Sequence, residues 1–280
     1  MKKLLILTAI LILVSFSVAF CEPVHVIVNI WDGTEREKMR PLYYQGLLPN
    51  LKLLGPLHYL TSNMNCFDKG CMLSVTKPQH ATMFTGCLAN VHGVFSNEIF
   101  KRIPDNITVQ ELIKLNNPAV KVAQISGKNE HFGHKIFGGI MNDVDLYMQY
   151  DRNPDFFMPT VLKLIQDWKN FDYFIVLHFR MPDIAGHAHG VESTEYSNEI
   201  KNNDTYLGEI LAAIEDNKNG AKNILYVLSD HGFGCPDPTL HTCAPYTFIV
   251  SNDPALVGGF KMRGVAELFL YHFGLRPFCE

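Results

Sequence analysis

The segment SVTKPQHATMFTG, residues 74–86, brings together a hydroxyl group, a proline and a histidine at spacings that suit chemistry. Thr76, Pro78 and His80 lie at positions i, i+2 and i+4. Proline is favoured in the first turn of a helix, where its missing N–H group would have no partner, so the segment predicts a helix that begins near Thr76. The start of a helix favours an anion. Thr76 therefore has two interpretations: a cap of this helix, or a nucleophile held against a phosphate group.

Aspartate and histidine residues follow three apolar segments that are typical of buried strands. The segments are 24–31, 171–179 and 223–229, and the polar residues after them are Asp32, Asp183, His187, Asp230 and His231. In open α/β sheets, ligands bind at the carboxyl ends of the strands. Asp32 alone, because Gly33 follows it, is equally well explained as a turn residue. The coincidence of three such strand ends indicates a site at one edge of a sheet.

Strands alternate with helices along the rest of the chain. Further strands are predicted at 119–126 and 246–251, and helices at 108–115, 157–170, 193–217 and 264–275. Thr108 and Glu111 have the spacing of a capping box at the start of one helix. Strands that are apolar on both faces predict an α/β fold with a mostly parallel central sheet and helices on both of its faces. The segment 128–156, rich in Gly, Asn and Asp, is interpreted as a small lid or insertion.

The composition is that of one globular domain. The chain has 280 residues, of which 47% are hydrophobic and 19% are charged. Its net charge of −4 argues against a general nucleic-acid partner, because such proteins are basic. Six cysteines lie beyond Cys21, and some of them can pair in an oxidising compartment. The pairing itself cannot be deduced from the sequence.

The first residues have the pattern of a secretory signal peptide. Lys2 and Lys3 precede an apolar run at 4–14, and the residues Ser-Val-Ala end at Ala19 as at a cleavage site. The prediction is a signal peptide at 1–19, a catalytic domain at 20–280 and export to the periplasm or the extracellular space, with no stable membrane span after cleavage. An uncleaved anchor or a lipoprotein attached through Cys21 is a weaker interpretation, because the apolar run is short for a span.

Six short motifs occur in a fixed order. They are DG at 32–33, TKPQH-x4-TG at 76–86, HG-x3-N at 92–97, D-x2-GH at 183–187, SDHG at 229–232 and HT-x2-P at 241–245. This ordered set resembles the alkaline phosphatase superfamily. Within it, the set is most similar to the type I phosphodiesterase/nucleotide pyrophosphatase branch, from residue 24 to about residue 251. The resemblance implies an alkaline phosphatase-like fold, here reduced to a minimal core with little cap.

The resemblance also implies a site with two divalent metal ions. Carried over position by position, one ion would be held by Asp32, Thr76, Asp230 and His231, and the other by Asp183, His187 and His241. Mixed Asp and His ligands favour zinc, with manganese as the alternative. Metal coordination would activate the Thr76 hydroxyl as the nucleophile. Asn97 matches the asparagine that donates a hydrogen bond to a phosphate oxygen. His80 and His92 are interpreted as structural, and His178, inside a strand, as core or as support for the ligands.

The predicted reaction is hydrolysis of a small anionic phosphate ester, and a phosphodiester is the first choice of substrate. The first alternative is a phosphomonoesterase on the same core, in which Lys77 or Lys128 would contact the additional phosphate oxygens. The segment SGKNEHFG at 126–133 is similar to a sulfatase signature, with Lys128 and His131 as substrate contacts. A sulfatase is less favoured, because its nucleophile is made from Cys or Ser. A binding protein that has lost catalysis is the last alternative, since every ligand position is kept. The natural leaving group and the oligomeric state stay open.

Overall fold

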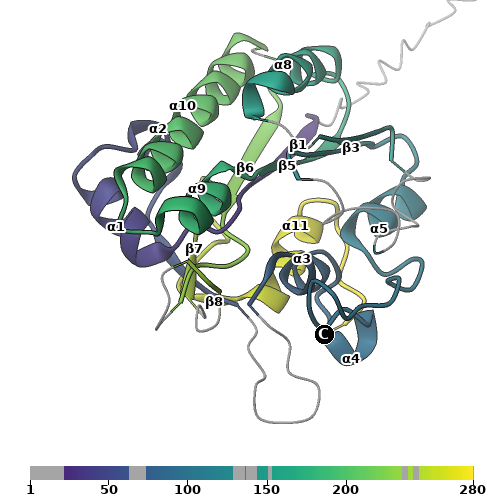
Figure 1. Ribbon diagram of the computed structural model, residues 1–280. Helices are drawn as coiled ribbons and strands as arrows, with labels where there is room; N and C mark the ends of the chain where they lie inside the picture. The colour runs from purple at the N-terminus through teal and green to yellow at the C-terminus, as the bar shows by residue number, and fades with distance from the viewer. Residues whose placement is uncertain are drawn as a thin grey trace, which may run out of the picture.

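The computed structural model describes residues 22–62, 74–128, 136, 144–150, 153–217, 219–234, 239–241 and 246–279 (Figure 1). Within these ranges the strands form one sheet in the order β4-β3-β5-β1-β6-β7-β2-β8. The strands are β1 (Val24–Trp31), β2 (His58–Thr61), β3 (Lys121–Ser126), β4 (Leu146–Gln149), β5 (Tyr173–Phe179), β6 (Lys222–Leu228), β7 (Tyr246–Ser251) and β8 (Phe260–Lys261). The α-helices are α1 (Arg36–Tyr44), α2 (Pro49–Leu54), α3 (Thr76–Thr85), α4 (Ala89–His92), α5 (Val109–Asn116), α8 (Met158–Asp167), α9 (Met181–His189), α10 (Thr194–Asn217) and α11 (Val265–Tyr271). Two short 3-10 helices are η1 (Pro154–Phe156) and η2 (Met262–Gly264).

The sheet is mostly parallel, as the sequence predicts. Strand β1 is central and pairs in parallel with β5 and β6, while β3 pairs in parallel with β4 and β5. Strand β7 runs antiparallel to β6 and β2. The carboxyl ends of β1, β3, β5 and β6 therefore meet at one edge of the sheet. This edge is where ligands bind in open α/β folds.

Helices cover both faces of the sheet (Figure 1). In β1, Val26 and Val28 pack into a core with α3, α5 and α11, whereas Ile27 and Trp31 pack into a second core with α1, α2, α8 and α10. This alternation follows from the two-residue period of a strand. Each fully buried side chain of this kind contributes about 1.5–3 kcal/mol relative to an exposed one. Two apolar cores therefore hold the central strand from opposite sides.

Local signals in the sequence account for several helix boundaries. Thr108 and Glu111 form the predicted capping box at the start of α5, with both of its hydrogen bonds present. Helix α3 begins at Thr76, and its N-cap is Val75, whose side chain makes no capping hydrogen bond. All ten residues of α3 are buried, so this helix has no polar face for a periodicity argument to detect. The helix predicted at 264–275 is shorter, because α11 ends at Tyr271.

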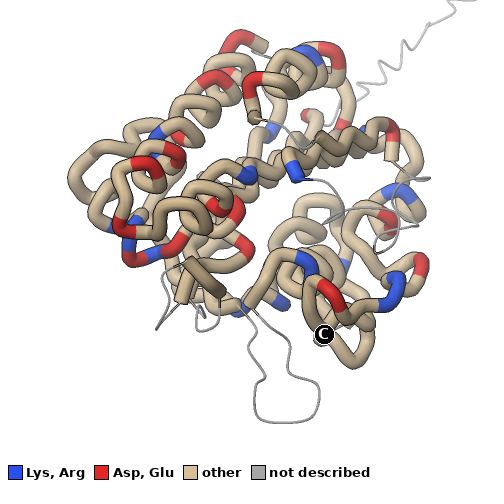
Figure 2. Tube along the Cα trace, viewed as in Figure 1, with Lys and Arg blue, Asp and Glu red and all other residues tan. Residues whose placement is uncertain are grey.

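Some predictions lie on residues outside the described ranges. The signal peptide at 1–19 is one of them, and so is part of the segment 128–156. In the described part of that segment, Leu146–Gln149 form β4, which pairs with β3 at the edge of the sheet. No helix in the described ranges is long and apolar enough to cross a membrane. Figure 2 shows acidic and basic residues interspersed along the trace.

A disulfide joins the end of α3 to the C-terminal segment. Cys87 bonds to Cys279, which is 192 residues away in the sequence. Gly86 ends α3 in the left-handed conformation, with φ of +71°, and an added Cβ atom there would lie 3.0 Å from Pro277 Cβ. The C-terminal segment therefore packs directly against the end of the helix that carries Thr76.

We expect the paired substitutions Cys87→Ser and Cys279→Ser to lower the free energy of unfolding by about 2–5 kcal/mol, because the unfolded chain loses a long cross-link. Urea unfolding followed by circular dichroism measures the change. With excess dithiothreitol present, the parent and the variant should unfold at similar urea concentrations. Equal midpoints in oxidising buffer would contradict the prediction.

Candidate metal centre and nucleophile

The ends of three parallel strands place three buried carboxylates at one edge of the sheet. Asp32 directly follows β1, Asp230 lies two residues past β6, and Asp183 lies in the first turn of α9, just after β5. Each of these residues is at most 2% exposed. Helix α9 also carries His187 one turn after Asp183, so both side chains lie on the same face of the helix.

A first group of donor atoms surrounds the ring of His231. Its Nε2 atom lies 3.0 Å from Thr76 Oγ1, 3.2 Å from Asp32 Oδ1 and 3.5 Å from Asp230 Oδ2. Four ligand atoms placed tetrahedrally around a zinc ion are about 3.3–3.5 Å apart, given the usual zinc–ligand bond lengths. The three distances from His231 Nε2 are therefore close to the ligand spacing around such an ion. The Thr76 hydroxyl faces this group, which argues against the helix-cap interpretation of that residue.

A second group of donor atoms forms a triangle beside the first. His241 Nε2 lies 3.2 Å from Asp183 Oδ1 and 3.0 Å from His187 Nε2, and the third side of the triangle, from His187 Nε2 to Asp183 Oδ1, is 3.6 Å. Three protein donors at this spacing are typical of a zinc site that keeps one position open for water or substrate. His187 is exposed, so this group lies nearer to solvent than the first group.

Backbone carbonyl groups orient the three histidine rings. His187 Nδ1 lies 2.7 Å from the Thr239 carbonyl oxygen, and His241 Nδ1 lies 2.9 Å from the Gly232 carbonyl oxygen. His231 Nδ1 is 3.3 Å from the same Gly232 oxygen. A carbonyl oxygen only accepts hydrogen bonds, so these contacts favour a proton on Nδ1 of each ring. In the neutral form with the proton on Nδ1, the Nε2 lone pair is the one that a metal ion would use. Burial would lower the pKa of His231, but without a metal ion Asp230 and Asp32 raise it to about 9.

The Asp-Gly turn after β1 allows the close approach of the two groups. Gly33 has a φ of +63°, and an added Cβ atom would lie only 2.7 Å from Asp183 Oδ1. Its N–H donates to Asp230 Oδ1 over 3.3 Å. Glycine is required here both for the left-handed conformation and for the contact with Asp183.

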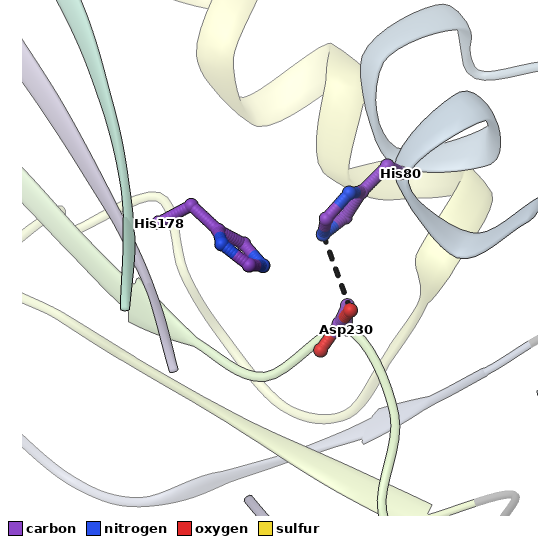
Figure 3. A group of neighbouring side chains, drawn as sticks. All are labelled: His80, His178 and Asp230. Atoms are coloured by element: carbon purple, nitrogen blue, oxygen red, sulfur yellow. Dashed lines mark ion pairs between the residues drawn. The ribbon is translucent and has the colours of Figure 1, made fainter. Parts of the chain in front are cut away.

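Two further histidines contact the carboxylates of the first group. Figure 3 shows His80 of α3 and His178 of β5 converging on Asp230. His80 Nε2 lies 3.1 Å from Asp230 Oδ2, and His178 Nε2 lies 3.3 Å from Asp32 Oδ2. Burial lowers the pKa of His80 to about 4, in spite of Asp230, so the ring is neutral near pH 7. The trio also has the spacing of a metal group. We interpret both rings as supports that orient ligands, because they already contact the carboxylates of the first group.

Lys128 supplies a positive charge to the carboxylates. Burial alone would raise the pKa of Asp32, but the Lys128 ammonium and the hydrogen bonds from His178 and His231 hold it well below its usual range. The pKa of Asp183 is also lowered: burial and Asp32 oppose this shift, and Lys128 and His241 cause it. Burial would lower the pKa of Lys128, but the two aspartates raise it instead, so the side chain is a permanent cation.

The structure separates the three residues that the sequence suggests as substrate contacts. Lys128 Nζ donates to Asp32 Oδ2 over 2.8 Å and to Asp183 Oδ2 over 2.7 Å. Lys77 Nζ instead donates to the Asn97 carbonyl oxygen over 2.6 Å and lies over the Phe100 ring. His131 lies outside the described residues. Lys128 is therefore the one of the two described lysines that contacts the carboxylates.

Asn97 is held beside Thr76. Its side-chain Oδ1 atom accepts a hydrogen bond from the backbone N–H of Lys77 over 3.0 Å. Lys77 directly follows Thr76, so this bond fixes the asparagine to the first turn of α3. With Oδ1 engaged, the Nδ2 group is the donor that Asn97 can offer to a ligand near Thr76.

Two features of the site are not predicted by the sequence. The sequence suggests Lys128 as a substrate contact, but its place between the two donor groups depends on the fold. The available signal was its position just after the predicted strand 119–126, which makes it a fourth residue at a strand end. For His178 and His80, the specific carboxylate partners could not be inferred, because they depend on which strands are neighbours.

Solved structures of several other proteins share this fold. The alkaline phosphatase from the Antarctic bacterium TAB5 has a TM-score of 0.65 and 14% identity, covering 91% of this chain and 99% of that chain. Murine ectonucleotide pyrophosphatase/phosphodiesterase 5 has a TM-score of 0.61 and 13% identity, covering 90% and 96%. The periplasmic domain of a phosphoethanolamine transferase from Campylobacter jejuni has a TM-score of 0.59 and 14% identity, covering 92% and 91%. At these identities the likeness shows the fold alone.

The sequence itself matches one protein family. The family model of type I phosphodiesterases/nucleotide pyrophosphatases matches residues 27–241, and the chain belongs to this family. The resemblance drawn from the motifs is confirmed. A protein of Schizosaccharomyces pombe, described as an uncharacterized pyrophosphatase/phosphodiesterase, is 24% identical over 263 residues, which make up 87% of this chain. The chain spans about half the length of that relative, 52%.

We expect His80→Ala to weaken zinc binding about 10- to 100-fold, because Asp230 loses the ring that orients it. Competition with a chromogenic chelator measures the affinity. The matched control is His92→Ala: His92 is also buried, but it contacts Thr82 Oγ1 and the Val94 N–H instead of a carboxylate. Equal zinc affinities for the parent and His80→Ala would contradict the supporting role.

Proposed function

We propose that this chain hydrolyses phosphate esters with Thr76 as the nucleophile and two divalent metal ions as cofactors. The observation that carries the proposal is the position of Thr76 Oγ1, 3.0 Å from His231 Nε2 and at the N-terminus of the ten-residue helix α3. A hydroxyl group at this position would be both activated and aimed at an anion. Membership of the phosphodiesterase family supports the same reaction class.

The two donor groups would each hold one metal ion. The first group consists of Asp32, Thr76, Asp230 and His231, and the second of Asp183, His187 and His241. Their mixed oxygen and nitrogen donors favour zinc, with manganese as the alternative. Bound ions would lower the pKa of a coordinated hydroxyl group or water and would offset negative charge on the reacting phosphate.

The residues of the chain then have distinct roles in two displacements. In the first, Thr76 Oγ1 forms a bond to phosphorus while the bond from phosphorus to the leaving oxygen breaks, and the leaving alcohol departs with the proton that Thr76 gives up. In the second, the oxygen of a water molecule bonds to phosphorus and the bond to Thr76 Oγ1 breaks, so the threonine regains a proton from that water. The Asn97 Nδ2 group and the Thr76 backbone N–H would hold a non-bridging oxygen through both steps.

The family makes a phosphodiester the first substrate to test, and a phosphomonoester is the second candidate on the same core. The sulfatase alternative has less support, because Thr76 cannot be converted to the aldehyde that a sulfatase needs. A binding protein without catalysis also has less support, because the donor groups and the hydroxyl are complete.

Export of the mature chain is part of the proposal. The signal-peptide pattern at 1–19 supports it, and so does the disulfide between Cys87 and Cys279, since such bonds persist in oxidising compartments. The phosphoethanolamine transferase domain with the same fold is periplasmic. The expected partner is a small anionic ester, with no nucleic acid and no stable membrane span after cleavage.

We expect Thr76→Ala to lower kcat/KM by about three orders of magnitude or more, because the nucleophile is lost. Zinc-loaded mature protein is assayed with bis-p-nitrophenyl phosphate, p-nitrophenyl phosphate and p-nitrophenyl sulfate, and EDTA-treated protein is the control for the metal. Thr76→Ser keeps a hydroxyl group and should retain much more activity. Acid quenching followed by mass spectrometry should find the phosphoryl adduct on the peptide that contains Thr76. Undiminished turnover by Thr76→Ala would reject this role.

Asn97→Ala should lower kcat for the preferred ester about 100- to 1,000-fold, because a donor to the charged phosphate is removed in the transition state. The same zinc-loaded assay measures the change. Asn97→Asp keeps the shape of the side chain but brings a negative charge, and it should be at least as damaging. A rise in KM alone, with kcat preserved, would show that Asn97 binds the ground state and the transition state equally, and would reject the role in stabilising charge in the transition state.

A further inference from the structure

Lys128 lies between the two donor groups and does not contact the carboxylate oxygens that face the histidines. In Asp32 and in Asp183, one carboxylate oxygen faces a histidine and the other accepts a hydrogen bond from Lys128. Asp32 Oδ1 faces His231, and Asp183 Oδ1 faces His241, at 3.2 Å in both cases. The Oδ2 atoms of both aspartates accept hydrogen bonds from Lys128 Nζ. The lysine and the histidine-facing donors can therefore be engaged at the same time.

The ammonium group of Lys128 has one more donor than these two carboxylates use. A lysine ammonium carries three N–H groups. Two of them are directed at Asp32 Oδ2 and Asp183 Oδ2, and the third is directed at Thr76 Oγ1 over 3.4 Å. A phosphoryl group bonded to Thr76 Oγ1 would bring one of its terminal oxygens within reach of the third N–H group. Lysine is a common binder of phosphate oxygens as a compact point charge.

The backbone fixes Lys128 in this position. Its carbonyl oxygen accepts hydrogen bonds from Ser126 Oγ and Gln149 Nε2, and its N–H donates to Ser126 Oγ. Its side chain is 18% exposed, so one side of it is accessible from solvent. The backbone of Lys128 is therefore fixed by hydrogen bonds, while part of its side chain is accessible to solvent.

The number of terminal oxygens distinguishes the two ester classes. A phosphodiester has two terminal oxygens on phosphorus, and a phosphomonoester has three and carries a second negative charge near neutral pH. In the proposed mechanism, Asn97 and the backbone N–H of Thr76 hold one of these oxygens, and the donor groups face the others. An additional fixed cation beside Thr76 would therefore interact most favourably with the third terminal oxygen, which a diester lacks.

We propose that Lys128 is a specificity-determining residue that binds the third terminal oxygen of a phosphomonoester, so that the chain accepts phosphomonoesters as substrates. This inference rests on the proposed function, because it requires phosphoryl transfer to Thr76. It selects between the two ester classes that share the same core. Lys77 does not take this role, because its ammonium group contacts the Asn97 carbonyl oxygen and the Phe100 ring instead.

The test compares two substrates that differ only by a methyl group on one oxygen, p-nitrophenyl phosphate and methyl p-nitrophenyl phosphate. Zinc-loaded parent, Lys128→Ala and the matched control Lys77→Ala are assayed with both. We expect Lys128→Ala to lower kcat/KM for the monoester about 10- to 100-fold more than for the diester, since a charge-assisted hydrogen bond is lost. Lys77→Ala should change both values by a similar factor. Zinc content, measured by mass spectrometry of the metal, should stay that of the parent in Lys128→Ala.

Several results would overturn the inference. Absence of monoester turnover by the parent is one, and an equal loss for both esters in Lys128→Ala is another, because it would indicate a purely structural role. If Lys128→Ala does not fold, inhibition of the parent decides: inorganic phosphate should inhibit at least tenfold more tightly than dimethyl phosphate, and equal inhibition rejects the contact. Full activity of Thr76→Ala would instead reject the proposed function, whatever the result for Lys128.

Discussion

The burial of three carboxylates at one edge of the sheet is the constraint on which the site depends. A charged group taken out of water is very costly unless it is paired and hydrogen-bonded. Lys128 bridges two of the aspartates, and His80 contacts the third. Backbone N–H groups of Gly33 and His231 add hydrogen bonds to the third carboxylate. These contacts offset the cost of burying the three charged groups.

The same constraint explains the arrangement of the elements around the site. Helix α3 is buried along its whole length. Its first residue, Thr76, and His80 one turn later both face the carboxylates. Strand β5 contributes His178 from its interior and leads directly into α9. The backbone carbonyl oxygens of Gly232 and Thr239 accept hydrogen bonds from Nδ1 of His241 and His187. Residues from distant parts of the chain therefore together stabilise the buried charges of the site.

The sequence predicts the strands well, because apolar runs are a strong local signal, and the structure brings the predicted Asp and His donors together in two groups. Apolar runs that end in Asp or His identify β1, β5 and β6, and the ordered motifs identify the family. Pro78 predicts that helix α3 begins near Thr76. The sequence does not predict that the helix is completely buried, because its polar and apolar residues do not separate onto opposite faces. The central place of Lys128 depends on β3 lying beside β5, and the order of strands in a sheet is not encoded in any short segment.

The disulfide was foreseen only as a possibility among many pairings, because six cysteines allow 15 connectivities. Its position also imposes an order on how the protein matures. The bond can close only after residue 279 has been synthesised, and by then Cys87 and the helix before it have long been made. The helix that begins at Thr76 is thus fastened to the segment around Cys279 only after both segments have been synthesised. Oxidation of this pair therefore separates the newly made chain from the cross-linked one.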